Sequence, residues 1–381
     1  MRAKLKKREM KPAKWGGGGK ERKWVRGLTT HILNSGPPTA PLILLLHGFP
    51  ELSYSRRKVL PLLSSTGDYY HVVAPDARGF GRTTGWDDRP FHAVDLHTFS
   101  TTALVRDVVL LVHALGYTAV ECVVGHDAGA VTAAMCAVVR PDLFRGVVLL
   151  SHPFNGMPEP QLPRASATGI GGEEMGKGGA EGAKPDVHAA LAGLGRKHHK
   201  WYYSTEGASA EMMNEGGRGG LAGFLRGKLA QMPGYYVMPV ECTMPEAVER
   251  EMVGAREEGV ERCRAWLTDE ELGVYVGEYR RTGFQGALNW YRVRTAKGAR
   301  FTWDYDVFAD RKIDVPCAFV SGLQDWGIYQ EPGAFERMRD GSVCSDFREM
   351  RLVDGVGHWA PQECPEEVVE VVLGLVRGLD G

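Results

Sequence analysis

The sequence predicts an α/β fold in which a mostly parallel, doubly wound sheet is interrupted by an inserted, mainly helical segment. Between residues 40 and 151, short apolar runs alternate with longer amphipathic stretches, which is the pattern of parallel strands joined by helices. After Pro153 the chain is rich in turn formers and then polar and mostly helical to about residue 295, where strand-like runs return. One α/β unit split by an insertion explains both halves of this pattern.

The individual elements follow from apolar spacing, taken in chain order. Continuous apolar runs predict buried strands at Leu42–Leu46, His71–Ala74, Val120–Val124 and Val147–Leu150. Aliphatic residues at helical spacing predict helices at Thr101–Leu115 and Ala130–Val139. Charged helices are expected in the insertion at Glu246–Arg256 and Asp269–Arg280. Beyond it we expect strands at Val315–Ser321 and Met350–Val353 and a last helix at Pro365–Leu379.

These elements divide the chain into four segments. Residues 1–26 hold 11 Lys and Arg against 2 Asp and Glu, and are expected to be a flexible basic extension. Residues 27–155 form the first part of the core, 156–296 the helical lid with a glycine-rich stretch near 169–183, and 297–381 the second part of the core. The net charge of −1 is therefore the sum of +9 in the extension and −10 in the remainder.

Composition excludes several classes of protein. With 43% hydrophobic and 24% charged residues the chain resembles soluble globular proteins, and its longest apolar runs fall far short of the ~20 residues that cross a bilayer. No apolar stretch typical of a secretory signal is found near the start, so a cytoplasmic enzyme is expected. Without a basic face beyond the extension, nucleic acid is not expected as a partner. Seven dispersed cysteines without a C-x-x-C pair indicate a reducing compartment and no metal site. We expect no cofactor, and the oligomeric state stays open.

The segment Gly125-His126-Asp127-Ala128-Gly129 carries the most chemical information. It lies between an apolar strand and a helix, and its small-x-nucleophile-x-small form is typical of a nucleophile elbow with Asp127 at its centre. A helix-capping aspartate would explain this segment as well, if it stood alone.

Three further turns favour a catalytic site over that alternative. A His-Gly-Phe-Pro turn at residues 47–50 follows an earlier strand, offers a second backbone N–H, and makes Phe49-Pro50 a candidate for a cis peptide bond. Asp325 and His358 each follow a later strand. In a parallel sheet such positions meet at the carboxyl edge. The order nucleophile, acid, histidine therefore predicts a catalytic triad.

At this point the sequence resembles the α/β-hydrolase family and, within it, the epoxide hydrolases. The resemblance runs from about Thr29 to the C-terminus. It rests on HGFPE at 47–51, PDARGFGRT at 75–83, GHDAGA at 125–130, TGFQGALNWYR at 282–292, GLQD at 322–325 and GHW at 357–359.

The resemblance implies a hydrolase that acts on the ether bond of a small apolar epoxide and adds water to give a vicinal diol. In such enzymes the residue that matches Asp127 attacks an epoxide carbon and forms an ester. Water activated by the residue that matches His358, with the residue that matches Asp325 as its partner, then hydrolyses that ester. The backbone N–H groups of Phe49 and Ala128 would form the oxyanion hole.

The resemblance also implies two tyrosine donors in the lid that assist ring opening. Tyr275 matches one of them. The register places His199 at the other, which is a departure, and leaves Tyr202 or Tyr203 as substitutes. Together with Trp201 these aromatic residues suggest an apolar substrate pocket or, equally, packing within the lid.

Two other functions stay open. Dehalogenases of the haloalkane or fluoroacetate type use the same aspartate, although Ala128 stands where haloalkane enzymes have Trp, and no arginine occurs in Ala128–Ala134 to grip a carboxylate. Trp201 could bind halide in such an enzyme. A ligand-binding protein that keeps the fold without turnover is the second alternative, because of the His199 departure and the glycine-rich stretch.

Overall fold

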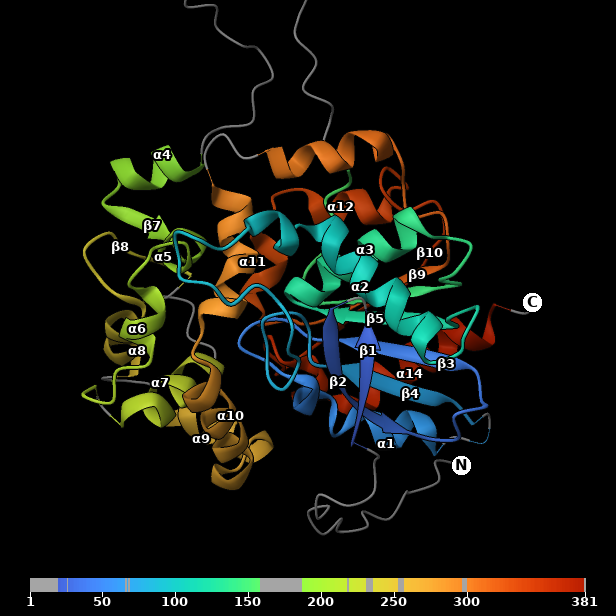
Figure 1. Cartoon of the computed structure of the whole chain (residues 1–381), viewed down its shortest axis with the longest axis horizontal. Helices are drawn as coiled ribbons and strands as arrows, with labels where there is room; N and C mark the ends of the chain where they lie inside the picture. The colour runs from blue at the N-terminus through green and yellow to red at the C-terminus, as the bar shows by residue number, and fades with distance from the viewer. Residues whose placement is uncertain are drawn as a thin grey trace, which may run out of the picture. The chain divides into compact units, whose positions relative to one another are not determined.

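The computed structural model describes residues 20–25, 27–65, 67, 69–157, 187–217, 219–230, 236–252, 257–296 and 300–379. The chain divides into two compact units (Figure 1). Unit 1 contains residues 1–87, 103–154 and 313–381, and unit 2 contains residues 88–102 and 155–312.

Unit 1 is built on an eight-stranded sheet in the order β1-β2-β4-β3-β5-β6-β9-β10. The strands are β1 Lys20–Val25, β2 Leu28–Ser35, β3 Leu42–Leu46, β4 His71–Pro75, β5 Cys122–His126, β6 Val147–Leu150, β9 Cys317–Gly322 and β10 Phe347–Val353. All neighbours from β4 to β10 are parallel, whereas β2 runs antiparallel to both β1 and β4. The parallel strands therefore end at one common edge.

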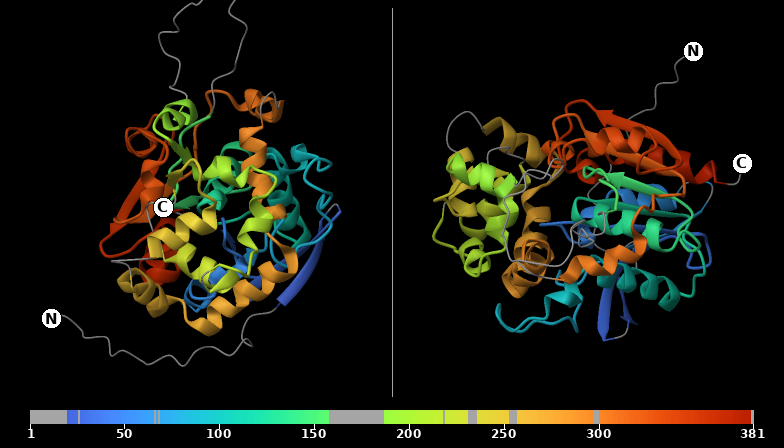
Figure 2. Two further views of the ribbon diagram at one scale, coloured as in Figure 1. Left: turned by 90° about the vertical axis from the view of Figure 1, so that its left-hand side faces the viewer. Right: turned by 90° about the horizontal axis from the view of Figure 1, so that it is seen from above.

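Helices cover both faces of this sheet (Figure 2). On one face α1 (Val59–Ser64) and α14 (Pro365–Arg377) share a buried core with the strands, which includes Cys122 and Val124 of β5. Alternate residues of a strand point to opposite faces. Gly125 accordingly lies against Ala133 of α3 (Ala128–Val139) on the other face. The remaining helices of unit 1 are η1 Ser53–Arg56, α2 Thr101–Ala114, η5 Trp326–Tyr329, α12 Ala334–Arg339 and α13 Ala360–Glu363.

Unit 2 is mainly helical. Its helices are η2 Leu96–Phe99, α4 Val187–Gly193, α5 His199–Tyr203, α6 Ala208–Met212, α7 Gly220–Leu229, α8 Met244–Met252, α9 Glu257–Trp266, α10 Asp269–Thr282, α11 Gln285–Thr295 and η4 Arg300–Phe308. A short antiparallel pair, β7 Arg196–His198 and β8 Val237–Pro239, completes the described part. Helix α10 begins at a capping box formed by Thr268 and Glu271, which satisfies two of the free N–H groups at its start.

The segment boundaries differ from the sequence prediction in three places. The lid predicted over 156–296 ends later, because unit 2 continues to residue 312. The extension predicted over 1–26 ends earlier, because Lys20–Val25 form β1 and pair with β2. Residues 88–102 belong to unit 2 instead of the core. The guanidinium group of Arg292 on α11 lies 3.5 Å from the centre of the Phe91 ring and donates to the Phe91 carbonyl, so this segment is attached to unit 2. The glycine-rich stretch 169–183 lies outside the described residues.

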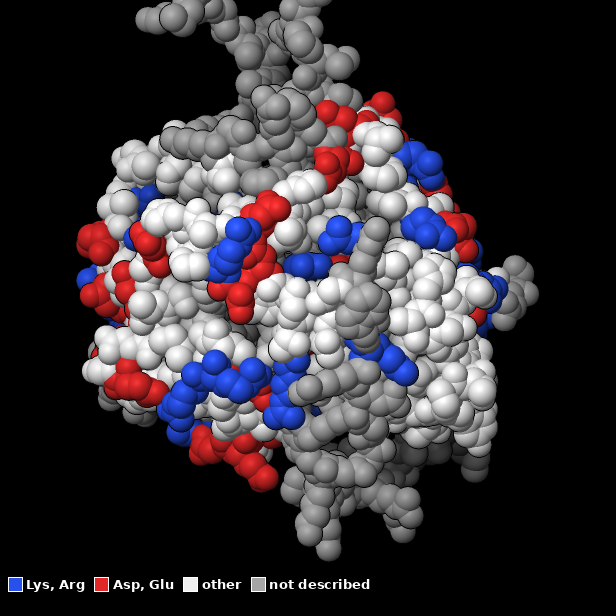
Figure 3. All heavy atoms as spheres, in the orientation of Figure 1, with Lys and Arg blue, Asp and Glu red and all other residues white. Residues whose placement is uncertain are grey.

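Charges of both signs are mixed on the surface. On the face in Figure 3, Lys and Arg side chains lie beside Asp and Glu side chains at most places. Ion pairs within each unit agree with this view, such as Arg145–Glu121 in unit 1 and Arg280–Glu215 in unit 2. Among the described helices, none is both long enough and apolar enough to cross a bilayer.

Candidate active site

Asp127 stands in a strained turn between β5 and α3. Its backbone angles are φ 54° and ψ −124°, a region that costs a non-glycine residue about 1–3 kcal/mol and persists only where the surroundings enforce it. Gly129 permits the turn, because a Cβ atom there would lie 2.5 Å from the carbonyl oxygen of His47. The nucleophile elbow predicted over Gly125–Gly129 is therefore present, and Asp127 lies beyond the carboxyl end of β5.

The turn after β3 brings a backbone donor to this carboxylate. The Phe49–Pro50 peptide bond is cis, as the sequence suggested. The Phe49 N–H donates to Oδ1 of Asp127 at 2.9 Å. Only glycine fits at Gly48, where a Cβ atom would lie 2.3 Å from Asp127 Oδ1 and 2.8 Å from the Ala128 nitrogen. The amides of Phe49 and Ala128, expected from the resemblance to form an oxyanion hole, are thus both beside Asp127.

Asp325 and His358 meet Asp127 at the same edge of the sheet. His358 Nδ1 lies 3.0 Å from Asp325 Oδ1, and His358 Nε2 lies 3.6 Å from Asp127 Oδ2. Asp325 follows β9 and His358 follows β10, and both are almost fully buried. The carboxylate of Asp325 also accepts hydrogen bonds from the Gly327 N–H at 2.6 Å and the Ser321 hydroxyl at 2.9 Å. The three residues predicted as a triad lie together.

The two carboxylates and the imidazole shift one another's ionisation. Burial alone would raise the pKa of Asp127, but its contact with His358 and the Phe49 N–H outweigh burial and hold the pKa well below its usual range. The pKa of Asp325 is likewise lowered by His358 against the effect of burial. Burial alone would lower the pKa of His358, but Asp325 and Asp127 raise it to about 10. At neutral pH the site therefore holds two carboxylates around an imidazolium ion.

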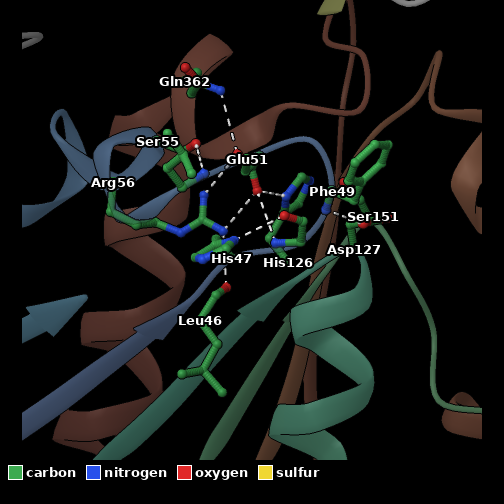
Figure 4. Close-up of polar contacts among 12 residues, drawn as sticks. Leu46, His47, Phe49, Glu51, Ser55, Arg56, His126, Asp127, Ser151 and Gln362 are labelled. Atoms are coloured by element: carbon green, nitrogen blue, oxygen red, sulfur yellow. Dashed lines mark hydrogen bonds and ion pairs between the residues drawn. The ribbon is translucent and has the colours of Figure 1, made fainter. Parts of the chain in front are cut away.

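Beside this group lies a buried network that our sequence analysis missed (Figure 4). Glu51 accepts hydrogen bonds from both terminal nitrogens of Arg56 at 3.1 Å, and its Oε2 lies 2.6 Å from His126 Nδ1. All three side chains are shielded from solvent. Burial alone would raise the pKa of Glu51, but Arg56 and His126 hold it well below its usual range. A charged carboxylate is stable here because both of its oxygens are paired.

His126 connects this network to His358. Its Nε2 atom lies 2.6 Å from the backbone carbonyl oxygen of His358, and its Nδ1 atom faces Glu51. Both partners, a carboxylate and a carbonyl group, accept hydrogen bonds, so the ring bridges Glu51 and the His358 backbone. Both residues lie in motifs that the sequence shows, because Glu51 belongs to HGFPE and His126 directly precedes Asp127. No spacing in the sequence indicates that these two residues, 75 positions apart, would pair. Nor does it indicate that Arg56 would be the second partner of Glu51.

The predicted lid residues all lie in unit 2. Tyr275 is fully buried on α10. On α5 the ring of His199 packs against Tyr203, with 5.4 Å between ring centres, and Trp201 stacks on His188 at 4.1 Å.

The hydroxyl of Tyr202 donates to Glu211 at 2.7 Å. Burial, followed by this carboxylate, raises the pKa of Tyr202. This contact engages the Tyr202 hydroxyl inside unit 2.

Among the described residues, no group of three or more His, Cys, Asp or Glu side chains is arranged to hold a metal ion. The seven cysteines are buried and unpaired by disulfides, and the nearest two, Cys317 and Cys344, have their sulfur atoms 3.9 Å apart.

Fold and site together define an α/β-hydrolase with an aspartate at the elbow. The family model described as alpha/beta hydrolase fold matches residues 41–167. The chain is 31% identical to epoxide hydrolase B of Mycobacterium tuberculosis, with 93% of this chain and 97% of that protein covered. It is 32% identical to epoxide hydrolase A of the same organism, with 93% and 96% covered.

Solved structures agree with these sequence comparisons. The structure of potato (Solanum tuberosum) epoxide hydrolase I matches with a TM-score of 0.70 at 27% identity, over 95% of this chain and 99% of that one. An epoxide hydrolase from an endophytic Streptomyces matches with a TM-score of 0.73 at 27% identity, over 96% and 97%. The chain belongs to the epoxide hydrolase family.

Proposed function

We propose that this protein hydrolyses epoxides to vicinal diols through an ester formed on Asp127. The observation that carries the proposal is the pair of contacts that Asp127 makes. The Phe49 N–H binds Oδ1, whereas Oδ2 faces His358 at 3.6 Å without a direct hydrogen bond. Oδ2 is therefore the oxygen available for attack, and Oδ1 becomes the carbonyl oxygen of the ester.

In the first step, Oδ2 of Asp127 forms a bond to an epoxide carbon while the bond from that carbon to the ring oxygen breaks. A carboxylate ionised at neutral pH needs no base for this attack. The ring oxygen takes up a proton from an acid, and Tyr275 is our candidate for one donor. His199 is our candidate for a second donor.

In the second step, water attacks the carbonyl carbon of the ester and gives its proton to His358. The N–H groups of Phe49 and Ala128 stabilise the oxyanion that forms on Oδ1. Ester formation itself prepares the base. The ester carries no charge, so one of the two carboxylates that raise the pKa of His358 is lost, and the pKa falls towards the range in which the imidazole can accept a proton. Asp325 stabilises the imidazolium ion. When the oxyanion collapses, the bond between the carbonyl carbon and the substrate oxygen breaks, this oxygen takes the proton from His358, and the diol leaves with Asp127 restored as a carboxyl group.

The proposal is tested with a panel of styrene oxide, a haloalkane and fluoroacetate, scored for diol against released halide. We expect diol from the epoxide, whereas halide release without diol would favour a dehalogenase. Asp127→Ala should abolish diol formation. Asp142→Ala is the matched control, because Asp142 is exposed and pairs with Arg140 away from the site. If Asp127→Ala kept full activity, the covalent mechanism would be wrong.

A further inference from the structure

The backbone on either side of His358 is held by one carboxylate. Oε2 of Glu363 accepts a hydrogen bond from the Gly357 N–H at 2.9 Å, and Oε1 accepts one from the Trp359 N–H at 2.8 Å. These are the two residues that flank His358. Glu363 is the last residue of the single-turn helix α13. This turn of helix brings the Glu363 side chain back to the loop that carries His358. Both carboxylate oxygens are used for this purpose.

The carbonyl group of His358 is held by two other side chains. It accepts hydrogen bonds from Nε2 of His126 at 2.6 Å and from the hydroxyl of Ser151 at 2.7 Å. Ser151 follows β6, is fully buried, and has a backbone φ of 63° that is unusual for serine. Four hydrogen bonds from three side chains therefore fix the peptide groups around His358.

We propose that Glu363 is a positioning residue for His358, and that it sets the rate of the hydrolysis step. The inference rests on the proposed function. The imidazole must keep Nδ1 at 3.0 Å from Asp325 while Nε2 stays near the Asp127 carboxylate, where water attacks. A histidine side chain has only two rotatable bonds, so a shift of its backbone moves Nε2 directly. Misplacement of a reacting group by about 1 Å lowers a rate by as much as ~100-fold.

This role predicts a kinetic signature that loss of stability would not produce. Attack by Asp127 does not use His358 as a base, so a displaced imidazole slows hydrolysis of the ester and spares its formation. When ester hydrolysis becomes slower, kcat and KM fall together and kcat/KM stays constant, because kcat/KM depends on binding and ester formation alone. Loss of folded enzyme would instead lower kcat and kcat/KM at constant KM.

The test compares Glu363→Gln with Glu366→Gln, using styrene oxide and rapid-quench measurement of both steps. The glutamine keeps the size of the side chain but places an NH₂ group against one of the two N–H donors. Glu366 is exposed in the first turn of α14 and receives the same change of charge. We expect Glu363→Gln to slow hydrolysis by roughly 10- to 100-fold with ester formation within about threefold of wild type. Glu366→Gln should match wild type.

Two further variants keep the result interpretable. Glu363→Asp is shorter by one methylene group and reaches one amide at a time, so its hydrolysis rate should lie between those of wild type and Glu363→Gln. Ser151→Ala removes a donor to the His358 carbonyl group and should show the same parallel fall of kcat and KM. If Glu363→Gln does not fold, Glu363→Asp and Ser151→Ala carry the comparison.

The results separate failure of this inference from failure of the proposed function. If wild type forms no ester with styrene oxide in quenched samples, the proposed function is wrong and the inference fails with it. If wild type forms the ester and the folded Glu363 variants hydrolyse it at the wild-type rate, Glu363 does not position His358. A fall in kcat/KM that equals the fall in kcat would also overturn the inference.

Discussion

Replacing Asp325 by Asn should separate the two steps of the reaction, because it removes a charge while keeping the geometry. Ser321 donates to Oδ2 of Asp325 at 2.9 Å, and a hydroxyl can also accept a hydrogen bond. The amide nitrogen of the variant can therefore face Ser321. Its oxygen then stays opposite Nδ1 of His358 and the Gly327 N–H, so the ring keeps its tautomer.

The size of the effect follows from the distance between the two groups. Opposite charges 3.0 Å apart, at an effective dielectric constant of about 20, attract by roughly 5 kcal/mol, which corresponds to about 4 pK units. Without this attraction the pKa of His358 falls below its wild-type value of about 10. The resting imidazole is then neutral more often than in the wild type, whereas the imidazolium that forms during ester hydrolysis lacks its partner.

In the transition state of ester hydrolysis His358 carries part of the positive charge of the imidazolium ion, so part of the attraction to Asp325 is lost there. We therefore expect Asp325→Asn to slow ester hydrolysis by roughly 10²- to 10⁴-fold. Ester formation should stay within about tenfold, since Asp127 remains ionised. In rapid-quench experiments with styrene oxide, mass spectrometry should find the enzyme heavier by one substrate molecule. Asp354→Asn is the control, because Asp354 is exposed on the same loop as His358. Hydrolysis within tenfold of wild type would refute the proposed role of the Asp325 charge.

Three other changes probe the buried network and the lid. Arg56→Met should destabilise the protein by roughly 3–5 kcal/mol, because it leaves the buried charge of Glu51 without its main partner, and thermal unfolding compared with the exposed-site variant Arg106→Met checks this. An unchanged unfolding temperature would contradict it. Tyr275→Phe, and His199→Ala if His199 is the second donor, should slow ester formation much more than ester hydrolysis. Equal effects on both steps would remove that residue from its proposed role.

The sequence predicted the centre of unit 1 more accurately than its edges. Strands β3 and β6 were predicted at their observed bounds, because continuous apolar runs mark strands that are buried on both faces. Strand β5 was predicted at Val120–Val124 and lies at Cys122–His126 instead. Gly125 and His126 resemble a turn in sequence, yet they pair with Leu149 and Leu150 of β6.

Elements that lack apolar patterning were missed. Strand β1 has the sequence KERKWV and lies at the edge of the sheet, where it pairs with β2. Because four of its six residues are charged, it has no apolar run or alternation from which a strand could be predicted. The triad could be predicted because each member follows a strand end within a recognisable motif. The contacts of Glu363 with the amides of Gly357 and Trp359 could not, because they depend on the local path of the backbone.

The ring of His126 connects the end of β5 with two loops that are remote in the chain. It is anchored on β5, one ring nitrogen faces Glu51 in the loop after β3, and the other faces the His358 carbonyl in the loop after β10. Thermal displacement of any of these loops must therefore be shared by the others or break a buried hydrogen bond. Placing only Asp127, Asp325 and His358 on another parallel sheet would reproduce the reacting groups. It would not reproduce the contacts of His126 that connect the segments carrying them.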